Sequence, residues 1–436
     1  MLLIYTHKIT PRLKYVFKQI FRGFLDVEIG FTTTIDEFIA YSGNKMSYGP
    51  NPLGGELFFQ SHSILFDQGI NDVELYVSEV EGVEVFMQVG PKSAMPFDVF
   101  GATFYLLSRY EEYLPHIRDD HNRFSSEDSF AFKNGFHKKP LVDIWTDKLY
   151  DILDSKFNFE KKRVKEFKYE STIDVSRVYE YNSKGFIRSV GGFFIDLAHF
   201  KIHKLYDRIL SNLGLVKDPF DSFSFLVRLQ KKYNIKMSYF FLLANYSRYD
   251  RNISYNKTRL HSLIREVGDR SNLGLHPSYF SNLMPEKFKL EKDRIESIAN
   301  FRINSSRQHY IKIQLPETYR HLINIEIFDD YSMGYADNIG YRASTAQVFY
   351  FYDLDFEIQT PLRIHPFMVS DYAMKYNMNL SPQKAQEEIT SMLEFAKSTN
   401  SCFCSLFHNN SLGRAEEWKG WRNVYVEMIK MVYDKE

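Results

Sequence analysis

The stretch "YESTIDVSRVYEYN", residues 169–182, determines how the second half of the chain is interpreted. Its apolar and β-branched lead-in is typical of a buried strand, and Asp174 stands where that strand would end. Because side chains alternate along a strand, the next position on the same face is Ser176, which carries a hydroxyl rather than a second carboxylate. The segment predicts a strand that brings one acid, with a serine beside it, to the edge where parallel α/β folds collect their chemistry.

Length and charge limit the class of protein. A chain of 436 residues is too long for one ordinary core, and we expect two domains. Lys plus Arg and Asp plus Glu both number 55, so the formal net charge is zero and we expect no nucleic-acid partner. The 39 Phe and 30 Tyr residues suit thick cores and also surfaces that stack on sugar rings. Composition alone does not separate those two uses.

The cysteines and the N-terminus indicate the compartment. Cys402 and Cys404 are separated by one residue, a spacing that puts both on one face of a strand and is poor for a disulfide. We interpret them as small buried side chains in a reducing environment. The N-terminal residues show no signal-peptide pattern, and no apolar run reaches the ~18 residues that a membrane span needs. We expect a soluble cytoplasmic protein with no transmembrane segment.

Residues 1–165 predict a smaller α/β domain of their own. "LLIYT" at the N-terminus is strand-like, and the segment after Pro11 repeats apolar residues at helical spacing. A buried helix is predicted over 98–114, and the charged segment 156–170 is the candidate linker.

Beyond residue 166 the chain alternates strand-like and helix-like segments, which favours an α/β layer or barrel with parallel strands. Predicted strands cover 171–175, 236–243, 272–277, 306–313, 323–329, 362–369 and 401–407. Predicted helices cover 286–299, 384–398 and 418–433.

Polar residues stand at the ends of these predicted strands. They are Asp174, His276, His309, Asp329, Asp330 and His408. Histidines and carboxylates at one edge of a sheet indicate a divalent metal with an acid and a base. Each residue also has a plainer role open to it, because a strand-end His is often only hydrogen bonded and a strand-end Asp often caps a helix.

The order of these segments resembles the polysaccharide deacetylase family (NodB homology, carbohydrate esterase family 4), and in particular a divergent subgroup with an α/β domain in front. The resemblance covers residues 166–436. It implies an irregular (β/α) barrel of about seven strands and hydrolysis of N- or O-acetyl groups on sugar polymers with a bound divalent metal. Residues 1–165 resemble the subgroup's leader domain, whose role is not known.

The resemblance assigns metal ligands and also shows two departures. "TIDVSR" matches the family's first motif at Asp174, the general base, but Ser176 occupies the place of the second acid, a metal ligand. "HPSYFS" keeps His276 of the histidine motif but has Phe280 at the place of the second histidine. His309, in "SRQHY", is the candidate to replace it. The implied metal is zinc, held by His276, His309 and Ser176.

The remaining assignments concern the acid and the substrate. "LFHN" resembles the closing motif, so His408 is the expected general acid, with Asn409 in substrate binding. "DDYSMGYADNIGYRAST" resembles a segment of the subgroup and brings in Asp330. Arg307 and Arg342 are assigned to orienting the acids or binding a substrate hydroxyl, and a structural ion pair is the alternative for either.

Two functions remain open at this point. The first is a metal-dependent deacetylase acting on an N- or O-acetylated sugar or glycan precursor. The second is a catalytically inactive member of the same fold that binds carbohydrate, in which Ser176 and Phe280 have removed the metal.

Overall fold

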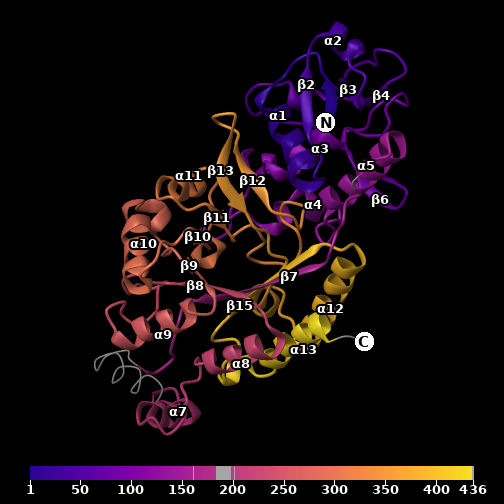
Figure 1. The fold of residues 1–436 in the computed structure, drawn as a ribbon. Helices are drawn as coiled ribbons and strands as arrows, with labels where there is room; N and C mark the ends of the chain where they lie inside the picture. The colour runs from indigo at the N-terminus through magenta and orange to yellow at the C-terminus, as the bar shows by residue number, and fades with distance from the viewer. Residues whose placement is uncertain (161, 183–197, 201, 435–436) are drawn as a thin grey trace. The chain divides into compact units, whose positions relative to one another are not determined.

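The computed structural model describes residues 1–160, 162–182, 198–200 and 202–434. The chain divides into two compact units, both built from helices and strands (Figure 1). The first unit contains Met1–Glu166, Gln314–Tyr319 and Gly340–Pro366. The second unit contains Phe167–Ile313, Arg320–Ile339 and Phe367–Glu436. The first break falls close to the end of the predicted linker, but the return of two later segments to the first unit has no signal in the sequence.

The first unit is organised around a parallel sheet in the order β2-β1-β3-β4. Its strands are β1 (Leu2–Tyr5), β2 (Ile29–Thr32), β3 (Lys45–Gly49) and β4 (Leu57–Gln60). Helix α1 (Pro11–Phe17) follows β1, and the Thr10 hydroxyl accepts a hydrogen bond from the Leu13 amide at its start. The predicted strand followed by a helix is therefore present at the N-terminus.

Further elements complete the first unit. Helix α3 (Val99–Leu107) is buried along its whole length, and Asp98 caps it by accepting from the amides of Phe100 and Gly101. The other elements are the π-helix η1 (Lys18–Phe24), helices α2 (Ile35–Ala40), α4 (Phe130–Lys133) and α5 (Leu141–Phe157), and the antiparallel pairs β5 (Ser78–Val80) with β6 (Val83–Val85) and β12 (Phe349–Asp353) with β13 (Ile358–Ile364).

The second unit contains parallel strands that lie in the order β11-β10-β9-β8-β7-β15-β14. They are β7 (Lys168–Val175), β8 (Met237–Phe241), β9 (Asn272–Leu275), β10 (Ser305–Ser306), β11 (Asp329–Asp330), β14 (Val369–Ser370) and β15 (Cys402–His408). The long strand β7 is central, and its neighbours β8 and β15 are both parallel to it. All carboxyl ends therefore meet at one edge.

Helices of the second unit lie between the strands along the chain, as a parallel sheet requires (Figure 1). They are α7 (Ile202–Asn212), α8 (Phe223–Tyr233), α9 (Thr258–Gly268), α10 (Glu286–Ala299), α12 (Pro382–Ser398) and α13 (Trp421–Tyr433), while α11 (Glu317–Asn324) crosses the division between the units. Helix α13 buries Trp421, Val424, Tyr425, Met428 and Ile429, the face that its spacing predicts.

The α/β class is confirmed, and some predicted details are not. No ladder closes the strands into a barrel in the part of the chain that the structure describes. The predicted strand 306–313 shrinks to β10, because Tyr310 and Ile311 take positive φ angles of 60° and 53° and turn the chain. Residues 323–324 of another predicted strand end helix α11, and only β11 remains extended.

A buried ion cluster holds the first unit together across a long sequence separation. Glu112 accepts from Nε of Arg109 at 2.8 Å and from Nε and Nη2 of Arg342 at 2.9 and 2.6 Å. Burial opposes ionisation of Glu112, but Arg342 and Arg109 outweigh it and lower its pKa to about 2. The stabilisation from ionised Glu112 and its two arginine partners is therefore complete above the ordinary Glu pKa and is lost as the pH falls towards 2.

We expect Glu112→Gln to reduce the free energy of unfolding by about 3–5 kcal/mol, because the two guanidinium groups would stay buried without their carboxylate. Urea denaturation at neutral pH measures this. Glu28→Gln is the matched control, since Glu28 is 73% exposed and pairs with an exposed Arg22 at 3.0 Å. The control should cost less than about 1 kcal/mol. Equal losses in the two variants would contradict the role assigned to the cluster.

Candidate active site at the carboxyl ends of the strands

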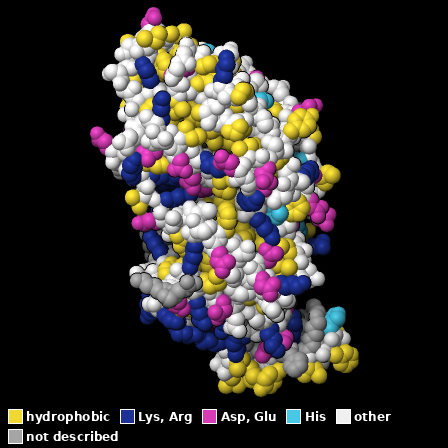
Figure 2. All heavy atoms as spheres, turned by 90° about the vertical axis from the view of Figure 1, so that its right-hand side faces the viewer, with side chains coloured by type: hydrophobic (Ala, Val, Ile, Leu, Met, Phe, Trp, Pro, Cys, Tyr) yellow, Lys and Arg dark blue, Asp and Glu magenta, His cyan; other side chains and the backbone are white. Residues whose placement is uncertain are grey.

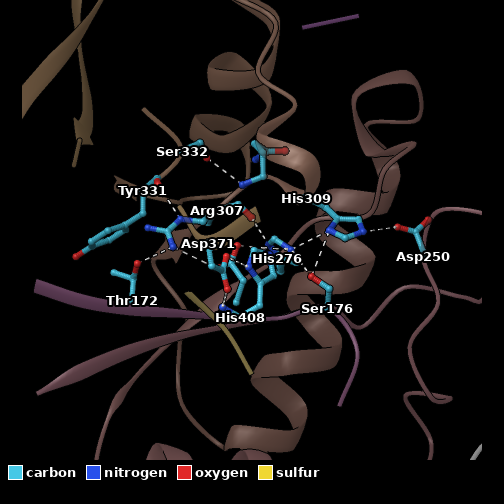
Figure 3. A network of polar contacts seen from close by, with 12 residues as sticks. Thr172, Ser176, Asp250, His276, Arg307, His309, Tyr331, Ser332, Asp371 and His408 are labelled. Atoms are coloured by element: carbon cyan, nitrogen blue, oxygen red, sulfur yellow. Dashed lines mark hydrogen bonds and ion pairs between the residues drawn. The ribbon is translucent and has the colours of Figure 1, made fainter. Parts of the chain in front are cut away.

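The parallel register of the second unit places polar side chains from several strand ends in one network (Figure 3). Asp174 near the end of β7 is the register partner of His408 at the end of β15. His276 directly follows β9, and Arg307 directly follows β10. Asp371 directly follows β14. Residues more than 200 positions apart therefore meet because their strands are neighbours.

Two histidines and a serine form the first part of the network. Nε2 of His276 lies 2.9 Å from Nδ1 of His309, and Oγ of Ser176 lies 3.1 Å and 3.5 Å from these two nitrogens. Both histidines are buried. Figure 3 shows the imidazole of His309 directed towards His276 on one side and towards Asp250 on the other.

Backbone carbonyls determine which ring nitrogens carry hydrogen. Nδ1 of His276 lies 2.7 Å from the carbonyl oxygen of Arg307, and Nε2 of His309 lies 3.3 Å from that of Tyr249. A carbonyl only accepts, so each of these nitrogens is the donor of its ring. Burial lowers the pKa of His276 to about 3, and burial together with His276 lowers the pKa of His309 to about 3. Both rings are therefore neutral at pH 7.

The consequence is that two lone pairs face each other at 2.9 Å, on Nε2 of His276 and Nδ1 of His309. The Ser176 hydroxyl has a single proton and relieves only one of them. A cation between the three atoms satisfies all of them. If one ring changed tautomer and placed its proton between the two histidines, the backbone carbonyl on its other side would lose its hydrogen-bond donor.

Asp174 and Arg307 form the second part of the network. Nη1 of Arg307 donates to Asp174 Oδ1 at 3.2 Å and to Thr172 Oγ1 at 2.7 Å, and Nε donates to the Tyr331 carbonyl at 2.8 Å. Arg307 is fully buried, and its Nη2 has no partner among the described residues. Burial raises the pKa of Asp174, while the charges of Arg307 and His408 oppose the rise. Asp174 Oδ2 lies 3.9 Å from His276 Nε2.

His408 and Asp371 form the third part. The Nδ1–H of His408 donates to Asp371 Oδ1 at 2.8 Å, and the His408 amide donates to Asp371 Oδ2 at 2.8 Å. Burial alone would lower the pKa of His408, but the charge and hydrogen bond of Asp371, with Asp174 beyond, raise it above the ordinary value. The side chain of His408 keeps 13% of its surface exposed, so this end of the network reaches solvent.

Two of the predicted substrate-binding residues, Asp330 and Asn409, form hydrogen bonds within the protein. Asp330 is buried and accepts from both Ser306 Oγ and Ser332 Oγ, at 3.0 and 2.9 Å. The Asn409 side-chain amide donates to the carbonyls of Arg177 and Phe220, both at 3.0 Å, and so supports the loops around the site.

Arg342 requires a correction. It belongs to the first unit, where Glu112 accepts from its guanidinium, so the structural ion pair that was the alternative for this residue is what the structure contains. The segment Gly340–Pro366, which contains Arg342, belongs to the first unit. Arg307 remains the arginine of the network.

The second departure also has a structural explanation. Phe280 packs in an aromatic cluster with Tyr249 and Tyr279, with ring centroids 5.8 and 5.1 Å away. His309, in the turn that follows β10, lies beside His276. The turn at Tyr310 and Ile311, both with positive φ, follows His309 directly.

Sequence reasoning missed two carboxylates of the network. Asp371 directly follows β14, which ends one residue beyond the predicted strand 362–369, so Asp371 was not recognised as a strand-end residue. Asp250 lies in the loop after β8, accepts from the Tyr279 amide at 2.9 Å and stands 3.9 Å from His309 Nε2. No motif in the sequence marks Asp250.

A comparison with family models gives a match in the N-terminal part of the chain. Residues 2–158 match the model of a family of unknown function, DUF7033. No curated protein matches the sequence.

Solved structures with a similar fold include deacetylases and a pseudoenzyme. A candidate polysaccharide deacetylase from Mycobacterium smegmatis is 13% identical, covers 64% of this chain and 87% of its own, and has a TM-score of 0.42. A polysaccharide deacetylase from Bacillus cereus is 11% identical over 61% and 88% of the two chains, with a TM-score of 0.29. A CE4 family pseudoenzyme from Bacillus anthracis is 9% identical over 62% and 64%, with a TM-score of 0.30. At these identities the chemistry has to be derived from this chain's own residues.

We expect Asp371→Asn to lower the pKa of His408, because the substitution removes the charge that outweighs burial. The stabilisation from the charged pair is complete below the ordinary His pKa and is lost as the pH rises through the raised pKa, so the variant should lose stability mainly on the acid side. NMR titration of the His408 ring in chelator-treated protein measures the shift. Asp250→Asn, next to His309, is the control and should leave His408 unchanged. An unaltered His408 pKa in Asp371→Asn would contradict the assignment.

Proposed function

We propose that the protein is a metal-dependent hydrolase that removes acetyl groups from an N- or O-acetylated sugar or glycan precursor. The observation that carries the proposal is the 2.9 Å distance between His276 Nε2 and His309 Nδ1, with a backbone carbonyl beside the other nitrogen of each ring. Histidine ligands of metals in proteins commonly donate their second N–H to such a partner. His276 and His309 therefore have the carbonyl partner that is usual for histidine ligands of a metal.

The distances support a small divalent ion with zinc as the first candidate. The three separations among His276 Nε2, His309 Nδ1 and Ser176 Oγ are 2.9, 3.1 and 3.5 Å. Ligands on a tetrahedral zinc ion, with bonds of about 2.0–2.1 Å, are separated by about 3.3 Å. Among the described residues no group of three or more His, Cys, Asp or Glu side chains is placed to hold a metal. The proposed third ligand is the neutral hydroxyl of Ser176, which lies beside both histidines.

A bound divalent ion would lower the pKa of a water molecule and polarise an acetyl carbonyl. Asp174 is the proposed general base. Burial raises its pKa towards a value suited to accepting a proton, while Arg307 holds the carboxylate in position. Because Asp174 Oδ2 is 3.9 Å from His276 Nε2, the acid lies beside the proposed ligands and is free to act as the base.

His408 is the proposed general acid. Asp371 keeps its Nδ1 protonated and favours the imidazolium, which leaves Nε2–H to donate a proton to the leaving sugar amine or alcohol. Base and acid sit on neighbouring strands as direct register partners. The partial exposure of His408 and Ser176 supports the approach of a substrate from this side. The unpartnered Nη2 of Arg307 supports a further donor to bound substrate.

One feature favours the second function, an inactive carbohydrate-binding protein. Ser176 supplies a neutral ligand where the resemblance implies a carboxylate, and a neutral oxygen attracts a divalent ion less strongly. Metal affinity therefore separates the two functions, and Ser176 is the residue to change.

We expect wild-type protein to bind zinc and Ser176→Asp to bind it at least about tenfold more tightly, because a carboxylate adds charge attraction that a hydroxyl lacks. Calorimetric titration of zinc, cobalt and manganese measures both affinities. The double variant Ser176→Asp/His276→Ala is the control for the identity of the site and should lose the gain. Absence of metal binding by both the wild type and Ser176→Asp would contradict the proposed enzyme.

Activity is tested separately on N-acetylated oligosaccharides by measuring released acetate. We expect Asp174→Asn and His408→Ala each to reduce the rate about 10²–10⁴-fold, the range usual for a general base or acid, with metal affinity retained. Lys397→Ala, an exposed residue of α12, is the control. Metal binding without acetate release from any acetylated sugar would favour the carbohydrate-binding function.

A further inference from the structure

Helix α7 (Ile202–Asn212) presents an apolar face to solvent. Ile202, Tyr206 and Ile209 follow each other at intervals of four and three residues, so they lie on one side of the helix. Residues just before and after the helix extend the same kind of surface. The exposed fractions are 86% for Phe200, 70% for Ile202, 65% for Tyr206, 46% for Ile209, 67% for Leu213 and 69% for Leu215. We call these six residues the α7 face.

Helix α7 exposes apolar side chains and buries polar ones, which is the reverse of the usual arrangement at a protein surface. Arg208 and Ser211, which are polar, are 8% and 2% exposed, whereas the apolar stripe points outwards. Arg208 lies with its guanidinium 4.7 Å from the ring centre of Tyr181. An amphipathic helix on a soluble protein normally buries its apolar stripe. Among the described residues the α7 face is therefore an exposed apolar surface, of the kind that marks an interaction site.

The loop that follows α7 is joined to other loops of the second unit by hydrogen bonds. Asp218, in the loop after α7, accepts from the amides of Glu180, Tyr181 and Asn182 at 2.7, 2.8 and 3.0 Å. These amides belong to the loop that follows β7. The side chain of Asn409 donates to the Phe220 carbonyl and ties the same loop to the end of β15.

A basic patch adjoins the α7 face. Lys217 and Arg414 are exposed, and the guanidinium of Arg414 donates to the Lys217 carbonyl. Arg422 lies near Arg228 and Arg414, and burial together with these two charges lowers its pKa. None of these four residues forms an ion pair with a carboxylate in the described part of the chain. We call Lys217, Arg228, Arg414 and Arg422 the basic patch.

Figure 2 shows this arrangement on the face of the molecule turned towards the viewer. Hydrophobic side chains gather at the lowest point, which is the level of α7 in Figure 1. Lys and Arg side chains gather directly above them, at the level of α8 and α13. Arg228 belongs to α8 and Arg422 to α13.

We propose that the α7 face and the basic patch together form a docking surface for an anionic lipid membrane, with α7 lying in the interface and not crossing it. Interfacial helices combine one apolar face, rich in aromatic and aliphatic side chains, with basic residues that contact anionic headgroups. No helix among the described residues is long and apolar enough to cross a membrane. Attachment through α7 therefore is peripheral.

Charge distinguishes a lipid surface from a second copy of this chain. Pairing of two α7 faces about a twofold axis would bring the basic patches of both copies close together, where they repel. An anionic bilayer instead places opposite charge beside the patch, and each basic residue near such a surface contributes favourably. The proposal does not depend on the reaction assigned to the site.

Vesicle flotation with the full-length protein tests the proposal. We expect the protein to float with vesicles of phosphatidylcholine containing about one third phosphatidylglycerol, and to bind them more weakly as salt is raised. Tyr206→Ser/Ile209→Ser should reduce binding at least about tenfold, because two apolar side chains no longer enter the interface. Lys217→Ala/Arg414→Ala should remove the preference for anionic vesicles.

The matched control is Leu283→Ser/Leu290→Ser, which replaces exposed leucines of the same unit that are 67% and 48% exposed. It should bind vesicles as wild type does, and circular dichroism should show all variants folded. Wild-type protein that stays with the unbound fraction at every lipid composition would overturn the proposal. So would a dimer in sedimentation equilibrium that Tyr206→Ser/Ile209→Ser dissociates while vesicle binding is unaffected.

Discussion

The contact between His276 and His309 is the constraint on which the rest of the site depends. Their facing nitrogens are 2.9 Å apart, and each ring is fixed from behind by a carbonyl oxygen that accepts its only proton. A pair of neutral imidazoles does not satisfy this geometry unaided, because both lone pairs point at the same space. His276 directly follows β9, and His309 lies in the turn after β10, which is the parallel neighbour of β9, so the sheet brings the two segments together.

The acid and base acquire different properties from their surroundings. Burial raises the pKa of Asp174, and Arg307 keeps it oriented, while Asp371 raises the pKa of His408. The proposed base, a buried carboxylate, and the proposed acid, an imidazole whose pKa is raised, are thus positioned on adjacent strands. The arrangement places their functional atoms around the His276–His309 pair without requiring either of them to be a ligand.

The sequence predicted the strand-end residues better than the strands themselves. Asp174, His276 and His408 were found because parallel strands collect their ends at one edge, which requires only approximate boundaries. Asp371 was missed because the predicted strand 362–369 ended one residue before β14 does, which left Asp371 two residues beyond the predicted end. The partner of Arg342 could not be predicted for a different reason. Periodicity describes local structure, whereas the return of Gly340–Pro366 to the first unit is decided by tertiary packing, including the buried contact with Glu112.

The most direct test of the account is to observe the ring nitrogens of His276 and His309 by nitrogen-15 NMR, first in chelator-treated protein and then with added zinc. The account predicts protonated Nδ1 on His276 and protonated Nε2 on His309 throughout, with zinc changing the resonances of the other nitrogen of each ring. His276→Gln and His309→Gln assign the signals. Resonances that do not respond to zinc, together with a proton shared between the two rings, would contradict the claim that this pair is built to hold a metal ion.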